Sequence, residues 1–538
     1  MAGKTVSVEG IITADSRAPG GWRGFYLQQA DHETDRNPAT SEALFVYTRH
    51  KAGKPGDRVR ITARVKEHYD LTELVDVARL TVCGSPGLPA PIPVTLPWRQ
   101  PPESLENMRI RVDTPLTVID TYELARYGAL TLANSDPVIA TEVQTPRPGQ
   151  NKPSSVQHRL VLDDGSSREH PRPIPWPPGG LTESNTVRAG DQITGIAGTL
   201  DFRHGAWRLQ PETTPAFLPA NPRKPPPQRP DAQHIRVLTL NLGNYFNGDG
   251  RGGDFPTPRG AESPEDFREQ HRRLVTALTA PDPDILALAE VENDGYGSNS
   301  AVAELARALG KPWRVVATPG QDGTDQIRTV LLYRADRVRA PGSPGRLASG
   351  PFQHRGRPPL GQVFQRLGGD AAVAVVVVHF KSKGCRNARG EDRNRGDGQG
   401  CYASRRQREA KAVLDWLEHW PAETKIAGTL VTGDLNAYAR EAPLQLLEQT
   451  GFTSMVHHFH PCSATHCPHY TYRYRGAKGS LDYALASKNL KPRILGAQTW
   501  LINADEPPAL SYQSTLNPAS PIPWRTSDHN PVIVDIRL

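Results

Sequence analysis

The sequence predicts a multidomain protein in which small all-β domains precede a larger, layered α/β domain. The chain has 538 residues, too many for one ordinary hydrophobic core. Pro-rich stretches at residues 86–102 and 221–233 are typical of stiff, extended linkers. Short alternating segments precede the second linker, whereas strands and helix-period segments alternate after Ile235, which indicates an α/β domain.

Residues 1–85 are predicted to form a small β-barrel. Val6–Ala14 and Asp57–Val65 alternate between apolar and polar residues, and residues 24–29 and 43–48 are rich in β-formers. The stretches GFYLQ, FVYT and GDRVRITARV resemble the OB-fold domains that precede some secreted bacterial nucleases. OB-folds bind oligonucleotides through aromatic platforms. The aromatic candidates for this role, which serve equally well as core or spacer residues, are Trp22, Phe25, Tyr26, Tyr47 and Tyr69.

Residues 103–220 repeat this pattern and predict a second OB-like β domain. Residues 191–200 parallel the strand at 57–65, and Trp207–Gln210 resembles a closing strand.

Residues 234–538 are predicted to form the α/β domain. Its expected strands span residues 235–240, 285–289, 330–333, 373–378 and 430–431, and its expected helices span 267–278, 301–309, 404–419 and 442–450. The all-apolar run Ala371–Val378 requires a sheet that is covered on both faces.

Positive charge is concentrated in one window of the chain. The net charge is +7 and the isoelectric point about 9.1. Residues 381–411 contain ten Lys or Arg and four Asp or Glu. Such a surface attracts a polyanion, although most charge runs are only solvated loops. Because this run follows directly after His379, we favour a nucleic acid as the partner.

The five cysteines predict two disulfides. Cys385 and Cys401 bracket a Gly-, Asp- and Arg-rich loop, and a bridge there would remove about 3 kcal/mol of unfolded-state disorder. Cys462 and Cys467 are close enough to bridge a smaller loop. The nearby His466 and His469 leave zinc as the alternative for this second pair, although the spacing matches no standard zinc finger. Cys83 follows an apolar run and is expected to be an inert, partly buried thiol.

The predicted disulfides indicate an oxidising compartment, and hence an extracellular or periplasmic location. No apolar run approaches the length that spans a bilayer, so we expect no membrane association. Residues 1–9 contain no apolar signal-peptide core. An exported protein would therefore have lost its signal peptide, and an intracellular protein is the alternative.

Three short segments place carboxylate, amide and imidazole groups beside apolar runs: Ala289–Asn293, Thr432–Asn436 and Thr526–Asn530. Such positions are where the strands of a buried sheet end. Hydrolysis of a phosphodiester requires a neutralised phosphate, an activated water and a stabilised leaving oxygen. Acids, amides and histidines gathered at strand ends can supply these functions together with a metal ion.

The segment from residue 234 to 538 resembles the DNase I-like endonuclease/exonuclease/phosphatase superfamily, and most closely secreted bacterial nucleases of the ExeM or NucH type. Eight stretches occur in the family's order, including LTLNLGNYFN, LALAEVEN, VVHFKSKGC, GDLNAYAREAP, GSLDYALAS and SDHNPVIV. The resemblance implies a four-layer α/β sandwich with a site at one edge of two packed sheets.

The resemblance also implies a metal site. Glu290 matches the metal-binding glutamate, Asn241 the asparagine beside the metal, and Asp528 an aspartate near it. Mg²⁺ is the first candidate because it prefers hard oxygen ligands, with Mn²⁺ or Ca²⁺ as alternatives. Glu292 is the alternative to Glu290, and simple turn chemistry is the alternative for Asn241.

The remaining site residues are assigned in the same way. Asp434 would align or deprotonate the attacking water, and Asn436 would donate to the phosphate. His529 would contact the phosphate or act as general base, with Asp482 fixing its tautomer. His379 would bind phosphate or protonate the leaving group. The basic candidates for substrate binding are Arg328, Lys381, Lys383 and Arg405. The chain departs from many relatives at Tyr483 and Asn530, where His and Asp are common.

These observations predict an exported, metal-dependent endonuclease that hydrolyses DNA, with RNA as a further candidate substrate and with little sequence preference. A phosphatase of the same superfamily acting on a small or lipid phosphate is the first alternative. The second alternative, from another class, is an OB-fold nucleic-acid-binding protein with an inactive catalytic domain. No obligate protein partner is evident from the sequence.

Overall fold

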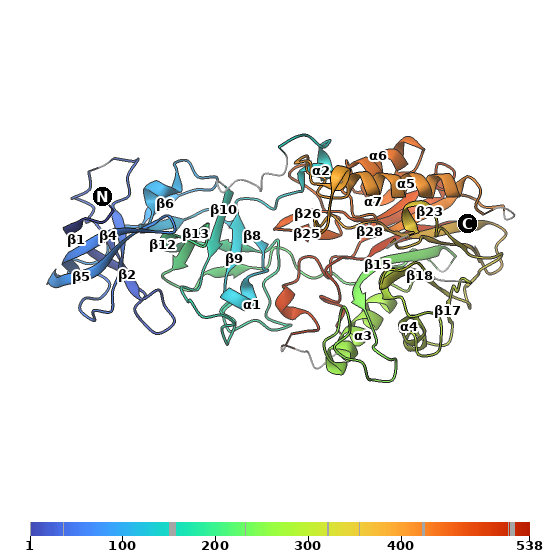
Figure 1. The fold of residues 1–538 in the computed structure, drawn as a ribbon, viewed down its shortest axis with the longest axis horizontal. Helices are drawn as coiled ribbons and strands as arrows, with labels where there is room; N and C mark the ends of the chain where they lie inside the picture. The colour runs from blue at the N-terminus through green and yellow to red at the C-terminus, as the bar shows by residue number, and fades with distance from the viewer. Residues whose placement is uncertain are drawn as a thin grey trace. The chain divides into compact units, whose positions relative to one another are not determined.

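The computed structural model describes residues 2–35, 37–149, 158–231, 233–319, 322–353, 356–421, 425–514, 516 and 522–538. Its contacts divide the chain into two compact units (Figure 1). The N-terminal unit contains residues 1–136, 152–222 and 507–509, and the C-terminal unit contains residues 137–151, 223–506 and 510–538. Among the described residues, no helix combines the length and the apolar character needed to cross a membrane.

The first five strands pair in a closed ring in the order β1-β2-β3-β5-β4, with β4 returning to β1. β3 and β5 run parallel, and the other neighbouring strands run antiparallel. Their alternating sequences direct apolar side chains such as Ile12, Val59 and Ile61 into one core. The bounds are β1 Thr5–Asp15, β2 Gly24–Gln28, β3 Ala43–Tyr47, β4 Arg58–His68 and β5 Leu71–Gly84.

The rest of the N-terminal unit contains a nine-stranded sheet in the order β14-β11-β8-β9-β10-β13-β12-β7-β6. This order differs from a second five-stranded ring. One reason is that β6 lies inside the expected linker 86–102 and pairs with β7. Another is Gly195, whose φ of 62° interrupts the expected strand 191–200. The bounds are β6 Ile92–Val94, β7 Arg109–Val112, β8 Leu116–Asp120, β9 Leu130–Ala133, β10 Arg159–Leu162, β11 Gln192–Thr194, β12 Ile196–Arg203, β13 Ala206–Pro211 and β14 Ala216–Leu218, with a short helix α1 at Leu124–Tyr127.

Two mixed sheets form the centre of the C-terminal unit. The first has the order β17-β18-β16-β15-β29-β28, and the second β19-β21-β22-β23-β27-β24 with β20 paired to β21. The first sheet contains β15 Ile235–Tyr245, β16 Ile285–Glu292, β17 Trp313–Val315, β18 Ile327–Arg334, β28 Ile494–Thr499 and β29 Val532–Ile536. The second contains β19 Val338–Arg339, β20 Gly345–Arg346, β21 Leu360–Arg366, β22 Ala372–His379, β23 Thr429–Asp434, β24 Thr453–Ser454 and β27 Asp482–Ala486.

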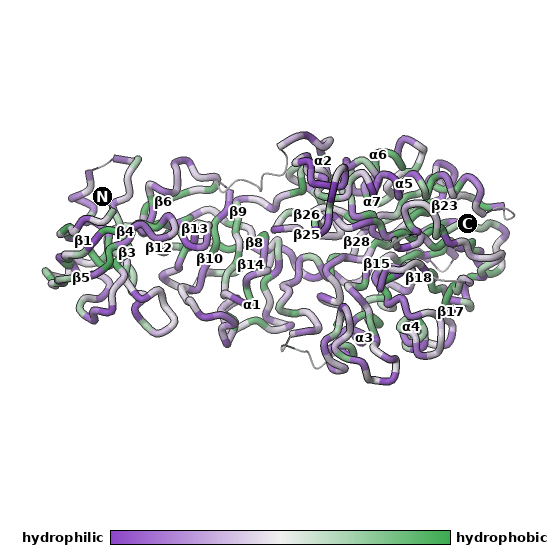
Figure 2. Tube along the Cα trace, viewed as in Figure 1, coloured by the Kyte–Doolittle hydropathy of each residue, from purple (hydrophilic) through white to green (hydrophobic). Residues whose placement is uncertain are grey.

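Helices cover the outer face of each sheet, which gives four layers (Figure 1). Val375 and Val377 of β22 point into the core between the sheets, whereas Val376 and Val378 pack toward the helices. The apolar run 371–378 is therefore covered on both faces, as its composition requires. Figure 2 shows hydrophobic residues along these strands. The helices are α3 Pro264–Thr279 and α4 Ala301–Leu309 on the first sheet, and α5 Ala403–Leu417 and α6 Ala442–Gln449 on the second. The short α7 Met455–Phe459 instead packs Met455 and Val456 into the core between the sheets.

Two parts of the C-terminal unit do not follow from the sequence pattern. Residues 137–151 belong to this unit and contain the short helix α2 Ala140–Val143. In the chain, this segment lies between β9 and β10 of the nine-stranded sheet. A separate hairpin, β25 Tyr472–Tyr474 and β26 Ala477–Gly479, precedes β27. Val138 forms an isolated bridge with Lys478 of this hairpin. The upstream segment therefore contacts the loop that leads into Asp482.

Candidate active site

Strand register brings three of the expected site residues side by side. β22 and β23 are parallel neighbours that pair His379 with Asp434, and β23 and β27 are antiparallel neighbours that pair Asp434 with Asp482. Side chains of paired residues point to the same face of a sheet. His379, Asp434 and Asp482 are all about 2% exposed. They form a buried row of acid and imidazole groups across the end of the second sheet.

The first sheet contributes Asn241 and Glu290 from two adjacent parallel strands. Asn241 pairs with Ala289, and the register between β16 and β18 shifts between Leu288 and Val291. At this irregularity Glu290 has a φ of 61°, so its side chain does not follow the strand's alternation. Glu292 instead accepts a hydrogen bond from the Asn247 amide at 3.1 Å, away from the row of acids. Of the two glutamates, Glu290 is the one that reaches the site.

The two sets of residues meet within hydrogen-bonding distance. Asn241 Nδ2 donates to Asp434 Oδ2 at 3.1 Å. His379 Nε2 lies 3.4 Å from the same Asp434 oxygen and 3.9 Å from Glu290 Oε1. The edges of both sheets therefore build one cluster, in which two carboxylates, an amide and an imidazole converge.

His529 completes the cluster from the loop that precedes β29. Its Nδ1 shares a hydrogen bond of 2.7 Å with Asp482 Oδ2, and both side chains are buried. The His529 amide donates to Ser527 Oγ at 3.1 Å, and Ser527 Oγ in turn donates to the Asn241 carbonyl at 2.7 Å. These contacts fix the loop that carries His529 to the first sheet. The Asp482 carboxylate accordingly sets the orientation of the imidazole ring.

Burial and crowding of like charges raise the pKa values of the acids. Burial, followed by the neighbouring Asp482, raises the pKa of Asp434 to about 7. Burial and the Asp528 carboxylate also raise the pKa of Glu290. A carboxyl group with a pKa near 7 is suited to accept a proton at neutral pH.

The pKa values of the two histidines shift in opposite directions. Burial works against the charged form of His529, but the carboxylates of Asp482 and Asp528 outweigh it and raise its pKa well above the ordinary value. Burial and the positive charge of Arg357 lower the pKa of His379 well below the ordinary value. These shifts favour the charged form of His529 and the neutral form of His379.

Asn436 braces Asp434. Its backbone amide donates to Asp434 Oδ1 at 2.8 Å, and its Nδ2 donates to Asp434 Oδ2 and to the Phe380 carbonyl, each at 3.1 Å. The two hydrogens of its amide group are thus both used inside the protein. The sequence assigns this amide to the phosphate, whereas the geometry uses it to orient the neighbouring acid.

The donor set fits a divalent cation. Glu290, Asp434 and Asp528 crowd several carboxylate oxygens together, and Asp482 Oδ1 is buried without a hydrogen-bond partner among the described residues. A dication would relieve this repulsion, and hard oxygen donors are the ligands that Mg²⁺ prefers. Atoms of Asp434, Asp482 and His529 also lie within 4.8 Å of one another. Because His529 and Asp482 already share a hydrogen bond, these three residues are better suited to share a proton than to bind a metal ion.

Arg357 is a site residue that the sequence pattern did not reveal. One guanidinium nitrogen lies 2.9 Å from His379 Nε2, another donates to the Phe380 carbonyl, and the residue is 8% exposed. It lies between Gly356 and Pro358, in a loop without secondary structure. No motif distinguishes it there from the many other arginines of the chain. Its guanidinium makes Nε2 of His379 the hydrogen-bond acceptor, which places the ring hydrogen on Nδ1.

Most of the basic residues expected to bind substrate are held in ion pairs. Arg328 is fully buried and pairs with Asp322 at 2.7 Å. Arg405 pairs with Glu409 at 3.1 Å. Lys383 donates to Glu441 Oε1 at 2.6 Å, and burial lowers its pKa to about 8. For Lys381, by contrast, no carboxylate among the described residues lies within ion-pair distance of the ammonium group, which lies over the Tyr402 ring at 4.8 Å.

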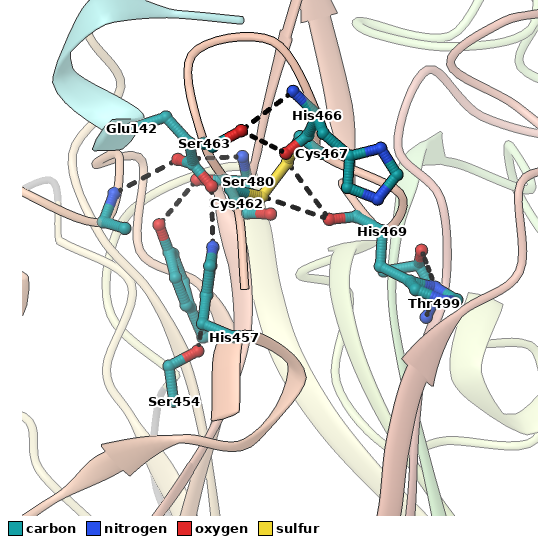
Figure 3. Close-up of a disulfide and its surroundings, with 12 residues drawn as sticks. Glu142, Ser454, His457, Cys462, Ser463, His466, Cys467, His469, Ser480 and Thr499 are labelled. Carbon is teal, nitrogen blue, oxygen red and sulfur yellow. Dashed lines mark hydrogen bonds and ion pairs between the residues drawn. A yellow bond between two sulfur atoms is a disulfide. The ribbon is translucent and has the colours of Figure 1, made fainter. Parts of the chain in front are cut away.

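The cysteines pair as Cys385–Cys401 and Cys462–Cys467. The second pair lies beside Glu142, and three ligand atoms of this group come within 4.8 Å of one another. Since the two sulfurs are bonded to each other, they are not thiolate ligands for zinc (Figure 3). Cys83 is exposed rather than partly buried. It lies near the end of β5, where the side chains no longer point into the ring's core.

Two of the aromatic candidates of the N-terminal ring belong to its interior. Phe25 and Tyr26 are fully buried, and the Tyr26 hydroxyl bonds Asp201 of the nine-stranded sheet. The Arg203 guanidinium lies over the Trp22 ring at 4.6 Å. Tyr47 and Tyr69 remain 40% and 86% exposed, at the edge of a cavity of about 1000 Å³. Trp22 and Tyr26 thus join the ring to the neighbouring sheet, whereas Phe25 belongs to the ring's core.

A four-layer α/β sandwich with acid, amide and histidine groups at the edge of both sheets defines a hydrolase of phosphate esters. The chain belongs to the Endonuclease/Exonuclease/phosphatase family, whose model matches residues 238–529. The family name spans nucleases and phosphatases, which are both hydrolases. A second model, of a domain of unknown function, matches residues 102–222. No curated protein matches the chain.

Several solved structures are similar to the chain. The human Nocturnin catalytic domain with bound sulfate is 18% identical, with 56% of this chain and 94% of that chain covered and a TM-score of 0.36. D. rerio TDP2 complexed with a single-strand DNA product is 16% identical, with 57% and 99% covered and a TM-score of 0.37. A mannosyl-6-phosphatase of Bacteroides thetaiotaomicron is 14% identical, with 56% and 98% covered and a TM-score of 0.36.

Proposed function

We propose that the protein is an exported, divalent-metal-dependent endonuclease that hydrolyses the phosphodiester bonds of DNA with little sequence preference, with RNA as a further candidate substrate. The observation that carries this proposal is the convergence of Glu290, Asn241, Asp434, Asp482 and His529 from both sheets. Family membership supports hydrolysis of a phosphate ester. The nuclease and metal assignments go further and rest on the chemistry of the site.

The proposed roles of the site residues follow from their chemistry and their favoured protonation states. Glu290, Asn241 and Asp528 would hold the cation, Mg²⁺ first among the candidates, which supplies Lewis-acid polarisation of the phosphate when bound. Asp434, with its pKa near 7, accepts the proton of the attacking water. His529 carries a positive charge that stabilises the developing negative charge on the phosphate. Arg357 would contact the phosphate, oriented by the hydrogen bond that it donates to neutral His379.

An extended cationic surface favours a polymeric substrate over a small phosphate. Arg386, Arg389, Arg393 and Arg395 are exposed in the loop that the Cys385–Cys401 disulfide closes. Gln399 of this loop accepts a hydrogen bond from the Ala442 amide at 3.0 Å, and Lys383 bonds Glu441. These contacts join the cationic loop to the segment that follows Asn436. A polyanion bound in the site would therefore extend over it.

The two disulfides support export, since such bonds persist in oxidising compartments. We further propose that the N-terminal ring is an OB-fold. Its closed order of five strands, with β3 parallel to β5, supports this assignment. The exposed Tyr47 and Tyr69 are its candidate contacts to nucleic acid.

The test is incubation of supercoiled plasmid with the full chain in Mg²⁺, Mn²⁺, Ca²⁺ or EDTA, followed by gel electrophoresis. Nicked circles should appear before linear DNA, and EDTA should prevent both. Glu290→Gln should abolish nicking but retain DNA binding in a fluorescence anisotropy titration. Glu292→Gln is the matched control, because this glutamate lies on the same strand and bonds Asn247 instead.

Two outcomes would contradict the proposal. Intact plasmid together with rapid release of phosphate from a sugar or lipid phosphate would identify a small-substrate phosphatase. DNA binding by the native chain without hydrolysis in any of the metals would identify a binding protein with an inactive catalytic domain.

A further inference from the structure

We propose that Glu142, from the segment 137–151 that lies far upstream of the catalytic strands, is a positioning residue of the active site. This inference rests on the proposed hydrolase function. The segment precedes β15 in the chain by more than 80 residues, yet it is part of the C-terminal unit. None of the sequence motifs includes it, and its importance lies in the loops that it holds.

The first part of the segment is hydrogen-bonded to two loops at the site. The Lys478 amide donates to the Pro137 carbonyl at 2.9 Å, and the Ile139 amide donates to the Lys478 carbonyl at 2.9 Å. The Arg440 amide donates to the Thr141 carbonyl at 2.9 Å, and the Thr141 hydroxyl donates to Glu441 at 2.8 Å. One loop leads into Asp482, and the other follows Asn436.

Glu142 joins the same two loops through a single oxygen. Its Oε2 accepts hydrogen bonds from the Ala439 amide at 3.2 Å and from the Ser480 amide at 3.3 Å. Its Oε1 lies 2.7 Å from His457 Nε2, and His457 Nδ1 is 2.8 Å from Ser454 Oγ (Figure 3). The residue is 2% exposed, so these partners replace the water that a carboxylate would otherwise bind.

The loops held by Glu142 carry two residues of the catalytic cluster. Ala439 follows Asn436 by three positions, and Ser480 precedes Asp482 by two. The Tyr483 hydroxyl reinforces the tie, because it lies 2.9 Å from the Ala437 carbonyl and 2.7 Å from the Ser480 carbonyl. Asn436 orients Asp434, and Asp482 orients His529. The pairing of β23 with β27 sets Asp434 opposite Asp482, and the Glu142 contacts hold the two loops that adjoin these strand ends.

Loss of the Glu142 hydrogen bonds to the two loops should lower the catalytic rate more than the affinity for substrate. Catalytic groups misplaced by about 1 Å can cost on the order of 10²-fold in rate, and outer contacts of a site are typically worth about 10- to 100-fold. Glu142 itself bonds the loops beside Asn436 and Asp482, whereas the cationic loop is held by other contacts, among them those of Gly149 with Gly396 and of Ala442 with Gln399. Loss of Glu142 should accordingly reduce kcat and leave KM for DNA nearly unchanged.

The experiment compares Glu142→Ala and Glu142→Gln in the full chain. The alanine variant should lower kcat for plasmid nicking by about 10- to 100-fold, with KM within about twofold of the native value. The glutamine variant should retain most of the activity, because its amide oxygen still accepts from the Ala439 and Ser480 amides. Glu269→Ala is the matched control: Glu269 is a buried carboxylate of α3 that pairs with Arg273, and its loss should lower the melting temperature without changing kcat.

Hydrogen exchange gives a readout that does not depend on activity. In Glu142→Ala the amides of residues 437–441 and 478–482 should exchange faster, while those of α3 should not. Native kcat together with unchanged exchange in the folded alanine variant would overturn the inference. So would equal losses of kcat in the glutamine and alanine variants. Should the alanine variant not fold, the glutamine variant and its exchange pattern decide. If the native chain hydrolyses no phosphate ester, the proposed function fails, and the exchange experiment still tests the tie.

Discussion

The hydrogen bond between Asp482 and His529 is the contact whose removal gives the sharpest test of the site. In Asp482→Asn the side chain keeps its size but loses its negative charge. The Nδ1–Oδ2 distance of 2.7 Å and the burial of both groups make this a charge-assisted hydrogen bond. Such bonds contribute about 1.5–3 kcal/mol, which corresponds to roughly a 10- to 100-fold loss of kcat if the whole contact acts in the transition state.

The same substitution should change the pH dependence. The Asp482 carboxylate helps to raise the pKa of His529, which favours the imidazolium form in the native protein. Removing that charge lowers this pKa. If the imidazolium form is the active one, the loss of activity on the alkaline side moves to lower pH. The measurement is kcat for plasmid nicking as a function of pH, between about pH 5.5 and pH 9.5.

Asp535→Asn is the matched control for this experiment. Asp535 pairs with Arg236 at 2.7 Å in a buried contact of the same unit. Its loss should reduce stability without moving the alkaline limb. The reasoning is refuted if Asp482→Asn keeps its native kcat and the same alkaline limb, or if both variants shift that limb equally.

Two further predictions concern stability. The Cys385→Ala/Cys401→Ala double variant releases a loop with a sequence separation of 16. In urea titrations without reductant it should lose about 3 kcal/mol of unfolding free energy, and its DNA binding should depend more steeply on salt. Native stability and native salt dependence would contradict both expectations. Burial raises the pKa of Glu106 to about 8, so this carboxyl binds a proton on folding and the fold loses stability as pH rises from about 4.3 to about 8. Glu106→Gln should therefore be more stable than the native chain near pH 8, by on the order of 3 kcal/mol, and similar to it near pH 4; an advantage that does not vary with pH would count against this assignment.

The sequence predicted the layers of the C-terminal unit because hydrophobic periodicity reports burial directly. The expected helix 301–309 coincides with α4, and the apolar run 371–378 is β22 with one residue's offset at its start and end. The gathering of several candidate site residues was also expected, since their segments follow predicted strands and strand ends can meet at one edge of a sheet; their individual roles come from the family resemblance. Strand register then places His379, Asp434 and Asp482 in one row.

What the sequence could not reveal depends on contacts between distant residues. Glu142 and Ser480 are 338 positions apart, and nothing in either segment indicates that they meet. Arg357 has no motif around it. Lys383 and Arg405 are candidates for substrate binding on the sequence, which shows charge but not the nearest carboxylate, here Glu441 and Glu409. The nine-stranded pairing of the second β region was likewise not predictable, because β-propensity does not determine which strands pair.

Two groups at the centre of the cluster, Glu290 and Asn436, have left-handed backbone conformations, with φ of 61° and 49°. For glutamate this conformation costs about 1–2 kcal/mol, whereas asparagine tolerates it and glycine adopts it freely. Glycine at position 290 would also remove a desolvated acid from a crowded neighbourhood. A selection for thermostability alone should thus enrich glycine at position 290 and yield stable but inactive variants. Only a selection for catalysis keeps the glutamate at this position.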